Sequence, residues 1–590
     1  MKAFKGPAVD FIEAFEVAPG PGRGEAVSAI ASKGTATVED VPTDLTAVED
    51  TPSPIDFSGM KIKTKGGVVK EVTLELSASA GTFDVASDSK IEVFDSGTGT
   101  VRLVGKTAHR KTYLDNASSV TFTGARNDFG EVEIAISVID EGVTTTETST
   151  SITIEELPDV LTGTPNPDTL TGDEGRDIIS GLGDNDMLSG NGGADTITGG
   201  DGKDTILGGA GADDLDGGAD EDVLQYFGSS AGVQIDLNLN GSGLQQASGG
   251  DAEGDVIQNF EHVYGSDFAD VITGDAGRNI LFGYDGADSI SGGAGDDVIR
   301  GGEGADTMDG GDGIDWLRYL ESSDGVTVDL SLALQVSAGD ADGDLISGYE
   351  NVQGSDLSDV ISGDDGANYI LGFDGDDVIS GGGGRDSIRG GAGADEMHGG
   401  DDVDTLQYNG STAGIIIDLN ADESGLQSAS GGDAEGDIIS GFEIVLATDF
   451  DDVITGDAGR NILYGYDGDD ILNGGDAKDA LRGGAGADQF VFDTALADSN
   501  VDRILDFEAG LDMLILAGDI FVGLAYGVLS ADAFHLAAGG LAANAGHRII
   551  YDSDTGDLYF DADGTGAAEA QHFAILTTTP LMDGTDVFIF

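Results

Sequence analysis

The sequence predicts an all-β protein: an N-terminal β-sandwich followed by a long, interrupted, right-handed parallel β-roll and a C-terminal β cap. Two observations predict this fold class. Residues 41–156 consist of short runs in which apolar and polar residues alternate, and in the rest of the chain aspartates recur every nine residues. Alternation with a period of two is typical of antiparallel strands. A fixed longer period indicates that similar turns of chain stack on one another.

The charge of the chain excludes several classes of partner. Its 590 residues contain 26 Lys and Arg against 111 Asp and Glu, a formal net charge of −85. Like charge would repel nucleic acid and anionic lipid, so neither is expected as a direct partner. There is no uninterrupted apolar run of the length that a membrane helix needs, so no membrane insertion is expected. The chain has no cysteine, which excludes disulfides and thiolate chemistry.

The first forty residues are predicted to be a flexible leader. They contain the Pro- and Gly-rich stretch 19–24 and lack the apolar run of a signal peptide. In residues 41–156 the alternation is clearest at 72–77 and 131–138, and its spacing predicts an antiparallel β-sandwich.

Three segments of this predicted sandwich, 46–52, 77–82 and 120–124, resemble cadherin-like and immunoglobulin-like modules of bacterial surface proteins. Glu49, Asp50 and Asp140 are either calcium ligands at a domain edge or part of an ordinary solvated acidic surface.

The nine-residue repeat keeps both an acid and an apolar residue in each unit. Residues 199–207 and 208–216 show it best, as Gly-Gly-x-Gly-x-Asp-x-apolar-x. The alternative interpretation of a Gly- and Asp-rich sequence is low-complexity disorder. Disorder does not explain why each unit keeps its apolar residue. The repeated acid position is occupied, in four blocks, by Asp168, Asp177, Asp186, Asp195, Asp204, Asp213, Asp222; Asp270, Asn279, Asp288, Asp297, Asp306, Asp315; Asp359, Asn368, Asp377, Asp386, Asp395, Asp404; and Asp452, Asn461, Asp470, Asp479, Asp488.

This pattern resembles the repeat of the RTX family of secreted, hemolysin-type calcium-binding proteins. Physically, six residues of loop and three of strand make half of an 18-residue coil, in which glycines take the corners and the apolar residue points inward. Stacked loops bring their carboxylates together, and a hard cation such as calcium suits ligands of carboxylate and carbonyl oxygen. Calcium is therefore the expected cofactor, as multiple ions, and folding is expected to depend on it. Asn279, Asn368 and Asn461 keep a ligand oxygen but drop a charge, so coordination should differ there.

Three related inserts separate the four blocks. Each begins at a tyrosine and contains the sequence Gly-Asp-Ala-acid-Gly-Asp. This turn is either a second kind of calcium loop or a simple acidic surface turn, and its candidate ligands are Asp251, Asp255, Asp340, Asp344, Asp433 and Asp437. The inserts are expected to continue the roll as longer strands. The predicted segments are blocks at 157–225, 265–318, 354–407 and 447–491, inserts at 226–264, 319–353 and 408–446, and a cap at 492–590.

The C-terminal segment resembles the capping and secretion region of RTX proteins, including that of serralysin. The resemblance rests on residues 504–512, 548–564 and 586–590. It implies an uncleaved signal for type I export machinery. The protein would then be secreted from a Gram-negative bacterium and be extracellular or on the cell surface.

The sequence holds little that indicates catalysis. The zinc-protease motif His-Glu-x-x-His is absent. Residues 228–232 fit the pattern Gly-x-Ser-x-Gly, but the equivalent loops of the next two inserts do not keep it, so we interpret Ser230 as part of a variable loop. Trp316, the single tryptophan, is interpreted as a packing residue.

The favoured hypothesis is therefore a calcium-binding structural protein without enzymatic activity. It would fold on export and assemble with itself, as a homo-oligomer or fibre, into a surface layer or biofilm matrix. The first alternative is an adhesin whose sandwich binds a cell-surface polysaccharide or protein while the roll serves as a stalk. The second is an unrecognised secreted hydrolase.

Overall fold

The computed structural model describes residues 158–590 except 336–338, 421–426, 538–540 and 567, and the backbone of strands between Thr35 and Glu155. The chain divides into two compact units, Met1–Leu157 and Pro158–Phe590.

The described backbone of the first unit is β-structure. Its main sheet has the order β2-β11-β10-β5-β8-β7, and smaller sheets pair β3-β9-β6 and β1-β4. All pairs are antiparallel except β2 with β11. The strands are β1 (Thr35–Glu39), β2 (Leu45–Val48), β3 (Ser53–Pro54), β4 (Lys61–Lys65), β5 (Val72–Ala78), β6 (Thr82–Val85), β7 (Ile91–Phe94), β8 (Thr100–Gly105), β9 (Val120–Thr123), β10 (Gly130–Asp140) and β11 (Val143–Glu155).

Strand β1 begins ahead of residue 41, where the sequence placed the start of the domain. The predicted leader up to residue 34 lies outside the described residues. So do the side chains of Glu49, Asp50 and Asp140. The cadherin-like or immunoglobulin-like sandwich therefore stays a prediction.

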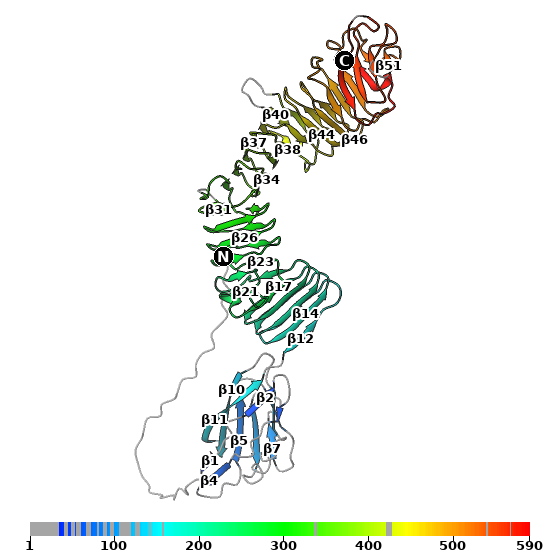
Figure 1. Cartoon of the computed structure of the whole chain (residues 1–590). Helices are drawn as coiled ribbons and strands as arrows, with labels where there is room; N and C mark the ends of the chain where they lie inside the picture. Colours follow the sequence, from blue (N-terminus) through cyan, green and yellow to red (C-terminus); the bar gives the residue numbers. More distant parts are fainter. Residues whose placement is uncertain are drawn as a thin grey trace, which may run out of the picture. The chain divides into compact units, whose positions relative to one another are not determined.

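The second unit is the predicted parallel roll (Figure 1). Successive strands alternate between two walls, and each pairs with the strand 18 residues further on; Ile179, for example, pairs with Ile197. One wall, here called the long sheet, is continuous over 20 described strands. The opposite wall consists of a first short sheet of 11 strands and a second short sheet of 13. The sequence prediction of long parallel sheets is confirmed.

The strands of the long sheet, in spatial order, are β13 (Thr169–Thr171), β15 (Met187–Gly193), β17 (Thr205–Gly211), β19 (Val223–Gln225), β23 (His262–Tyr264), β25 (Ile280–Phe282), β27 (Val298–Arg300), β29 (Trp316–Arg318), β32 (Asn351–Gln353), β34 (Tyr369–Asp374), β36 (Ser387–Ala392), β38 (Thr405–Gln407), β42 (Ile444–Leu446), β44 (Ile462–Asp467), β46 (Ala480–Ala485), β48 (Asp502–Ile504), β51 (Phe534–Leu536), β52 (Ile549–Tyr551), β53 (Asp557–Phe560) and β54 (Gln571–Leu576).

The first short sheet contains β12 (Asp159–Thr162), β14 (Asp177–Gly183), β16 (Thr196–Asp201), β18 (Asp214–Ala219), β22 (Val256–Gln258), β21 (Gln245–Ser248), β20 (Gln234–Asp236), β24 (Val271–Thr273), β26 (Ser289–Ala294), β28 (Thr307–Asp312) and β31 (Leu345–Ser347). The second contains β30 (Thr327–Asp329), β33 (Val360–Ser362), β35 (Val378–Gly382), β37 (Glu396–Gly400), β41 (Ile438–Ser440), β40 (Gln427–Ser430), β39 (Ile416–Asp418), β43 (Val453–Thr455), β45 (Ile471–Asn473), β47 (Gln489–Phe492), β49 (Met513–Leu516), β55 (Val587–Ile589) and β50 (Gly527–Val528).

The core between the walls is a column about one side chain wide per strand. Ile197, Ile206 and Leu215 come from successive strands and are fully buried. The corners need glycine: Gly200 has φ +128°, and a Cβ there would lie 2.3 Å from the carbonyl oxygen of Leu182 on the preceding coil. Such a core buries little apolar surface per residue, so the loops have to contribute to stability.

The inserts continue the roll, but not as the longer strands expected from the sequence. In the first insert, β20, β21 and β22 are short strands of which β21 runs antiparallel to both neighbours; β40 does the same in the third. The expectation was wrong because the chain doubles back after β20 and β39. Each insert also contains a 3₁₀ turn: η1 (Gly250–Ala252), η2 (Gly339–Ala341) and η3 (Gly432–Ala434).

Beyond β47 the parallel stacking ends in antiparallel pairs, β52–β53–β54 in one wall and β50–β55 in the other. Aromatic rings fill this end: the ring centroid of Phe573 lies 5.1 Å from that of Phe521 and 5.3 Å from that of Phe492. A last 3₁₀ turn, η5 (Gly584–Asp586), precedes the final strand. Among the described residues no helix has the length and apolar character needed to cross a membrane.

Candidate calcium-binding sites

The repeated acids form two ladders, one along each edge of the roll. Each ladder residue donates its backbone N–H to the side chain of the ladder residue one coil further on. The N–H of Asp186 lies 2.8 Å from Oδ1 of Asp204, and that of Asp204 lies 2.8 Å from Oδ1 of Asp222. One oxygen of each carboxylate thus joins two coils. This contact explains why the acid position is kept even where the rest of the unit varies.

The second oxygen, Oδ2, has no such donor in the later units of each block. It is buried and without a hydrogen-bond partner in Asp186, Asp204, Asp213, Asp222, Asp288, Asp297, Asp306, Asp315, Asp377, Asp386, Asp395, Asp404, Asp470 and Asp479. Burial of an unpaired acceptor is costly, and more so when it is charged. A row of such oxygens needs a positive partner that the protein itself does not supply.

The surroundings of these oxygens fit a hard cation. A Cβ at Gly181 would lie 2.1 Å from Oδ2 of Asp186 and 2.8 Å from the carbonyl oxygen of Gly199. The carboxylate oxygen and the carbonyl oxygen of the next coil therefore face the same space, which stays open because residue 181 has no side chain. Oxygen ligands without nitrogen or sulfur are the donor set that Ca²⁺ takes.

The pKa values of the ladder carboxylates show that their ionised forms are unfavourable in the fold without a cation. Burial, followed by repulsion from neighbouring carboxylates, raises the pKa of Asp288, Asp377 and Asp479 to about 8. The same causes raise the pKa of Asp222 and Asp470 to about 7. A nearby divalent cation stabilises the ionised form and reverses this shift.

The first unit of each block is different, because protein groups satisfy its carboxylate. Oδ2 of Asp270 accepts from the N–H of Ser266 at 2.7 Å, and Oδ1 accepts from the Ser266 hydroxyl at 2.8 Å and from the N–H of Val233 at 2.7 Å. Asp359 and Asp452 are held in the same way by Ser355 and Thr448. Thr164 contacts Asp168 likewise.

In the second units, other protein groups bond both side-chain atoms of Asn279 and Asn368, whereas only Oδ1 of Asn461 has a partner and its Nδ2 is buried without one. Oδ1 of Asn279 accepts from the N–H of Asp275 at 2.8 Å, and Nδ2 donates to the carbonyl oxygen of Glu261 at 2.7 Å. Asn368 makes the equivalent bonds with Asp364 and Glu350. Oδ1 of Asn461 accepts from Asp457. The amide nitrogen makes these positions poor cation ligands.

The second acid of each insert turn extends one ladder through the insert. Oδ1 of Asp255 accepts from the N–H of Asp213 at 2.8 Å, and its Oδ2 accepts from the hydroxyl of Tyr226 at 3.0 Å. The pairs Asp344 with Tyr319 and Asp437 with Tyr408 repeat this at 2.9 and 2.7 Å. Each tyrosine hydroxyl therefore gives Oδ2 of the insert acid a hydrogen-bond donor, which Oδ2 of the later repeat units lacks.

The first acids of these turns, Asp251, Asp340 and Asp433, lie near the same ladder and add to its repulsion. Burial is the main cause that raises the pKa of Asp213, with repulsion from Asp251 added to it. Burial likewise raises the pKa of Asp306, followed by repulsion from Asp344 and then Asp340. The Asp251 N–H donates to Oγ of Ser229. The choice between a second calcium loop and an acidic turn stays a prediction for these residues.

Sequence reasoning missed several ladder members. Glu261, Glu350 and Glu443 accept from the N–H groups of Asp222, Asp315 and Asp404 and carry the second ladder through the inserts. In the cap, Asp502 and Asp512 accept from Asp479 and Asp488. Their spacing of 23 and 24 residues breaks the period, so no repeat search would find them.

At the first coil, carboxylate oxygens of Asp159, Asp173 and Asp177 lie within 4.8 Å of one another, a group able to hold a metal ion. Only Asp177 was a sequence candidate. Asp173 replaces the second glycine of its unit, a substitution that could have indicated an additional acid near the ladder.

The other sequence candidates occupy ordinary positions. Ser230 is exposed in a turn with no helix after it, while the neighbouring Ser229 is buried and donates to the carbonyl oxygen of Ala231. Trp316 is half-buried on the outside of β29, with its ring 5.3 Å from that of Tyr369. Trp316 therefore packs against a neighbouring ring outside the core, since the inward position of β29 belongs to Leu317.

Comparison with known proteins agrees with the ladder geometry. The model of the RTX calcium-binding nonapeptide repeat matches residues 157–188, 189–224, 264–299, 282–317, 353–388, 371–406, 446–481 and 464–493. No curated protein matches the chain.

Two solved structures are similar in part. One is the extracellular lipase LipA from Serratia marcescens, 18% identical over 40% of each chain with a TM-score of 0.13. The other is the sixth cohesin of scaffoldin B from Acetivibrio cellulolyticus, in complex with a Cel5 dockerin; it is 7% identical over 21% of this chain and 100% of the cohesin, also with a TM-score of 0.13. The repeat matches and the two acidic ladders together show that residues 157–493 of this chain contain RTX calcium-binding nonapeptide repeats.

Proposed function

We propose that this chain is a secreted structural protein whose roll folds when calcium fills the ladders, and which then assembles with itself as a component of a surface layer or an extracellular matrix. The observation that carries the proposal is the row of buried Oδ2 atoms without donors, repeated in all four blocks. Calcium supplies the positive charge at these oxygens when bound.

The chain's own residues prepare each site. The N–H of one ladder residue fixes Oδ1 of the next and so directs Oδ2 toward the carbonyl oxygen of the adjacent coil. The glycine beside it leaves the space open. Without a cation the carboxylates of successive coils repel one another, and the narrow core does not compensate.

Export before folding agrees with this chemistry. A chain of net charge −85 would remain extended where calcium is scarce and fold where it is plentiful. The resemblance of residues 492–590 to RTX secretion regions supports a type I exporter as a partner. No catalytic role is part of the proposal, because Ser230 lies in a plain turn.

A calcium titration of the purified chain tests both halves of the proposal. Circular dichroism should show a cooperative rise in β signal from the chelated to the calcium-saturated state, and light scattering or electron microscopy should show assemblies only with calcium. An unchanged spectrum would contradict calcium-dependent folding. A folded protein that stays a monodisperse monomer at saturating calcium would contradict self-assembly alone.

A further inference from the structure

The outer face of the long sheet differs in charge from the rest of the roll. From β23 to β46 the first three residues of each strand are one inward residue between two outward ones, and none of these outward residues is Asp or Glu. The longer strands β34 and β44 end at the exposed acids Asp374 and Asp467. They include the arginines Arg300, Arg318, Arg389 and Arg482, and Arg503 follows on β48. We call the outward residues of β23–β48 the arginine face. The facing positions of the short sheets instead carry Asp236, Asp309, Asp329, Glu396 and Asp418, and their strands contain no Lys or Arg.

The arginines of this face are not all neutralised by the protein. Arg300 pairs with Glu321 and Arg482 with Asp506. Arg389 and Arg503 form no ion pair with any described residue. Arg318 donates to Gln353 and occupies the same position on β29 as Arg300 does on β27; burial and this neighbouring charge lower the pKa of Arg318. Two cations side by side destabilise a sheet unless an anion joins them.

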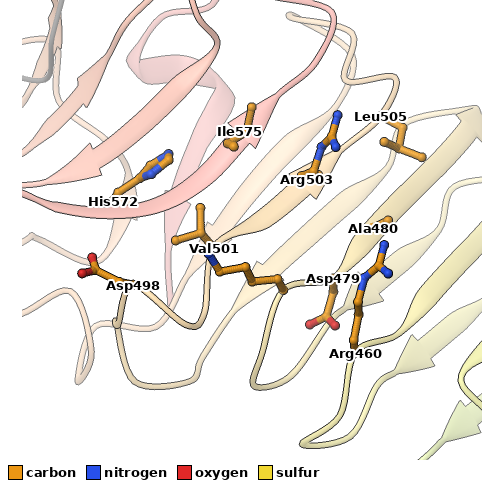
Figure 2. A pocket seen from close by; sticks show the side chains of 10 residues that line it. Arg460, Asp479, Ala480, Asp498, Val501, Arg503, Leu505, His572 and Ile575 are labelled. Atoms are coloured by element: carbon orange, nitrogen blue, oxygen red, sulfur yellow. The ribbon is translucent and has the colours of Figure 1, made fainter.

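At the C-terminal end of this face further cations line a pocket (Figure 2). Arg460 and Lys478 occupy the same loop position on successive coils, 18 residues apart, and Arg503 and His572 lie beside them. Two acids, Asp479 and Asp498, also line the pocket. The lining also includes the apolar residues Ala480, Leu505 and Ile575, of which Ala480 and Ile575 pair with Arg503 on either side. Neither Arg460 nor Lys478 has an ion-pair partner among the described residues. His572 pairs with Asp557, so Arg460, Lys478 and Arg503 face the two carboxylates of the lining and leave an excess of positive charge, which favours an anionic ligand in so acidic a chain.

Half-buried aromatic rings alternate with the arginines along the face. The rings of Tyr264 and Phe282 stack at 4.8 Å, and Trp316 contacts Tyr369 at 5.3 Å. Aromatic and Arg side chains are the residue types enriched in binding surfaces. Because neighbouring strands lie about 4.8 Å apart, the ten spacings from β23 to β46 extend over roughly 48 Å. A strip of this length suits an elongated ligand.

We propose that the arginine face binds a linear anionic polysaccharide lying along the roll. The guanidinium groups pair with carboxylate or sulfate groups of the polymer, and the aromatic rings pack against the apolar faces of its sugars. A peptide would add to a sheet edge, and the middle of the long sheet offers none. The dense phosphate charge of nucleic acid would be repelled by the acidic loops on both sides of the face.

The single tryptophan, Trp316, provides a local readout because it lies within the face. The calcium-loaded full chain is titrated with dextran sulfate, carboxymethyl dextran and neutral dextran of equal length while Trp316 fluorescence is followed. We expect a saturable change with a charged dextran and none with the neutral one; the two charged polymers distinguish sulfate from carboxylate recognition. Equal binding of neutral dextran, or tighter binding of polyglutamate or single-stranded DNA, would overturn the proposal.

Two matched triple variants distinguish binding at the arginine face from a general effect of positive charge. Arg318→Gln, Arg389→Gln and Arg503→Gln together should weaken binding by about tenfold to a hundredfold, since each exposed ion pair contributes modestly. Lys203→Gln, Arg278→Gln and Arg385→Gln remove the same charge from exposed loops and should leave the affinity unchanged. Circular dichroism with calcium checks folding, and replacing the three face arginines by lysine should restore most of the binding. Equal losses in both glutamine triples would contradict a specific face.

Discussion

Replacing Asp306 by asparagine tests whether the unpaired ladder oxygens are cation ligands. Asp306 is buried, its Oδ1 accepts from the N–H of Asp288, and its Oδ2 has no partner. Burial, and then repulsion from Asp344 and Asp340, raise the pKa of Asp306 from 3.8 to about 7. A shift of about three units corresponds to roughly 4 kcal/mol against the ionised form. Asp306→Asn removes this cost from the calcium-free roll and one charged ligand from the calcium-bound roll.

Both effects weaken the coupling between calcium binding and folding. At pH 8 we expect a smaller calcium-induced gain in β signal by circular dichroism, because the calcium-free chain becomes no less ordered than wild type and the calcium-bound roll has lost a charged ligand. Equilibrium dialysis should show less bound calcium at saturation.

The matched control is Asp270→Asn, in the first unit of the same block. Ser266 and Val233 donate hydrogen bonds to its carboxylate. In the asparagine variant the side-chain NH₂ would face the backbone N–H of Ser266, so that a donor meets a donor. We expect this to cost about 1–3 kcal/mol of stability with or without calcium. The amount of bound calcium should not change. If both variants lost calcium equally, or neither did, the distinction between unpaired and protein-satisfied ladder positions would be refuted.

Three further predictions concern acidity, space and the insert turns. Because the ladder carboxylates have pKa values of about 6 to 8 in the fold and near 3.8 when unfolded, the calcium-free roll should gain stability as pH falls from 8 to 5.5; a chelated sample whose β signal is flat over this range would argue against it. Gly181→Ala should place a methyl group 2.1 Å from Oδ2 of Asp186 and so weaken calcium-dependent folding. Gly241→Ala is the control, because it has open space around it and should fold at the wild-type calcium concentration. Equal calcium titrations of the two variants would argue against a cation site in the space beside Gly181. Tyr226→Phe leaves Oδ2 of Asp255 buried without its donor and should lower stability in calcium by about 1–3 kcal/mol, measured by thermal unfolding, and an unchanged melting temperature would show the bond to be dispensable.

The architecture of the roll could be predicted from sequence because its determinants are local. One acid and one apolar residue per nine positions define the coil, and residues such as Asp204 and Ile206 lie where that period places them. The ladder positions across the inserts could not be predicted. Glu261 continues the ladder from Asp222 over 39 residues of chain, and no period connects the two.

The division of the ladder into different kinds of position also depends on contacts that spacing does not show. Asp270 and Asp288 are equivalent in the repeat, yet only Asp270 has a serine hydroxyl within hydrogen-bond distance. The Ser-Asp or Thr-Asp pair at the start of the later blocks was visible in the sequence, but its effect requires knowing that Ser266 lies beside the carboxylate. The arginine face likewise emerges only when strands distant in sequence are placed side by side.

The most direct test of the calcium ladder is anomalous diffraction at long wavelength from crystals grown with saturating calcium. We expect peaks beside Oδ2 of the unpaired ladder residues, such as Asp204, Asp306 and Asp395, and none at the amide nitrogens of Asn279 and Asn368. Peaks confined to the exposed acidic surface, with no density along the ladder, would contradict it.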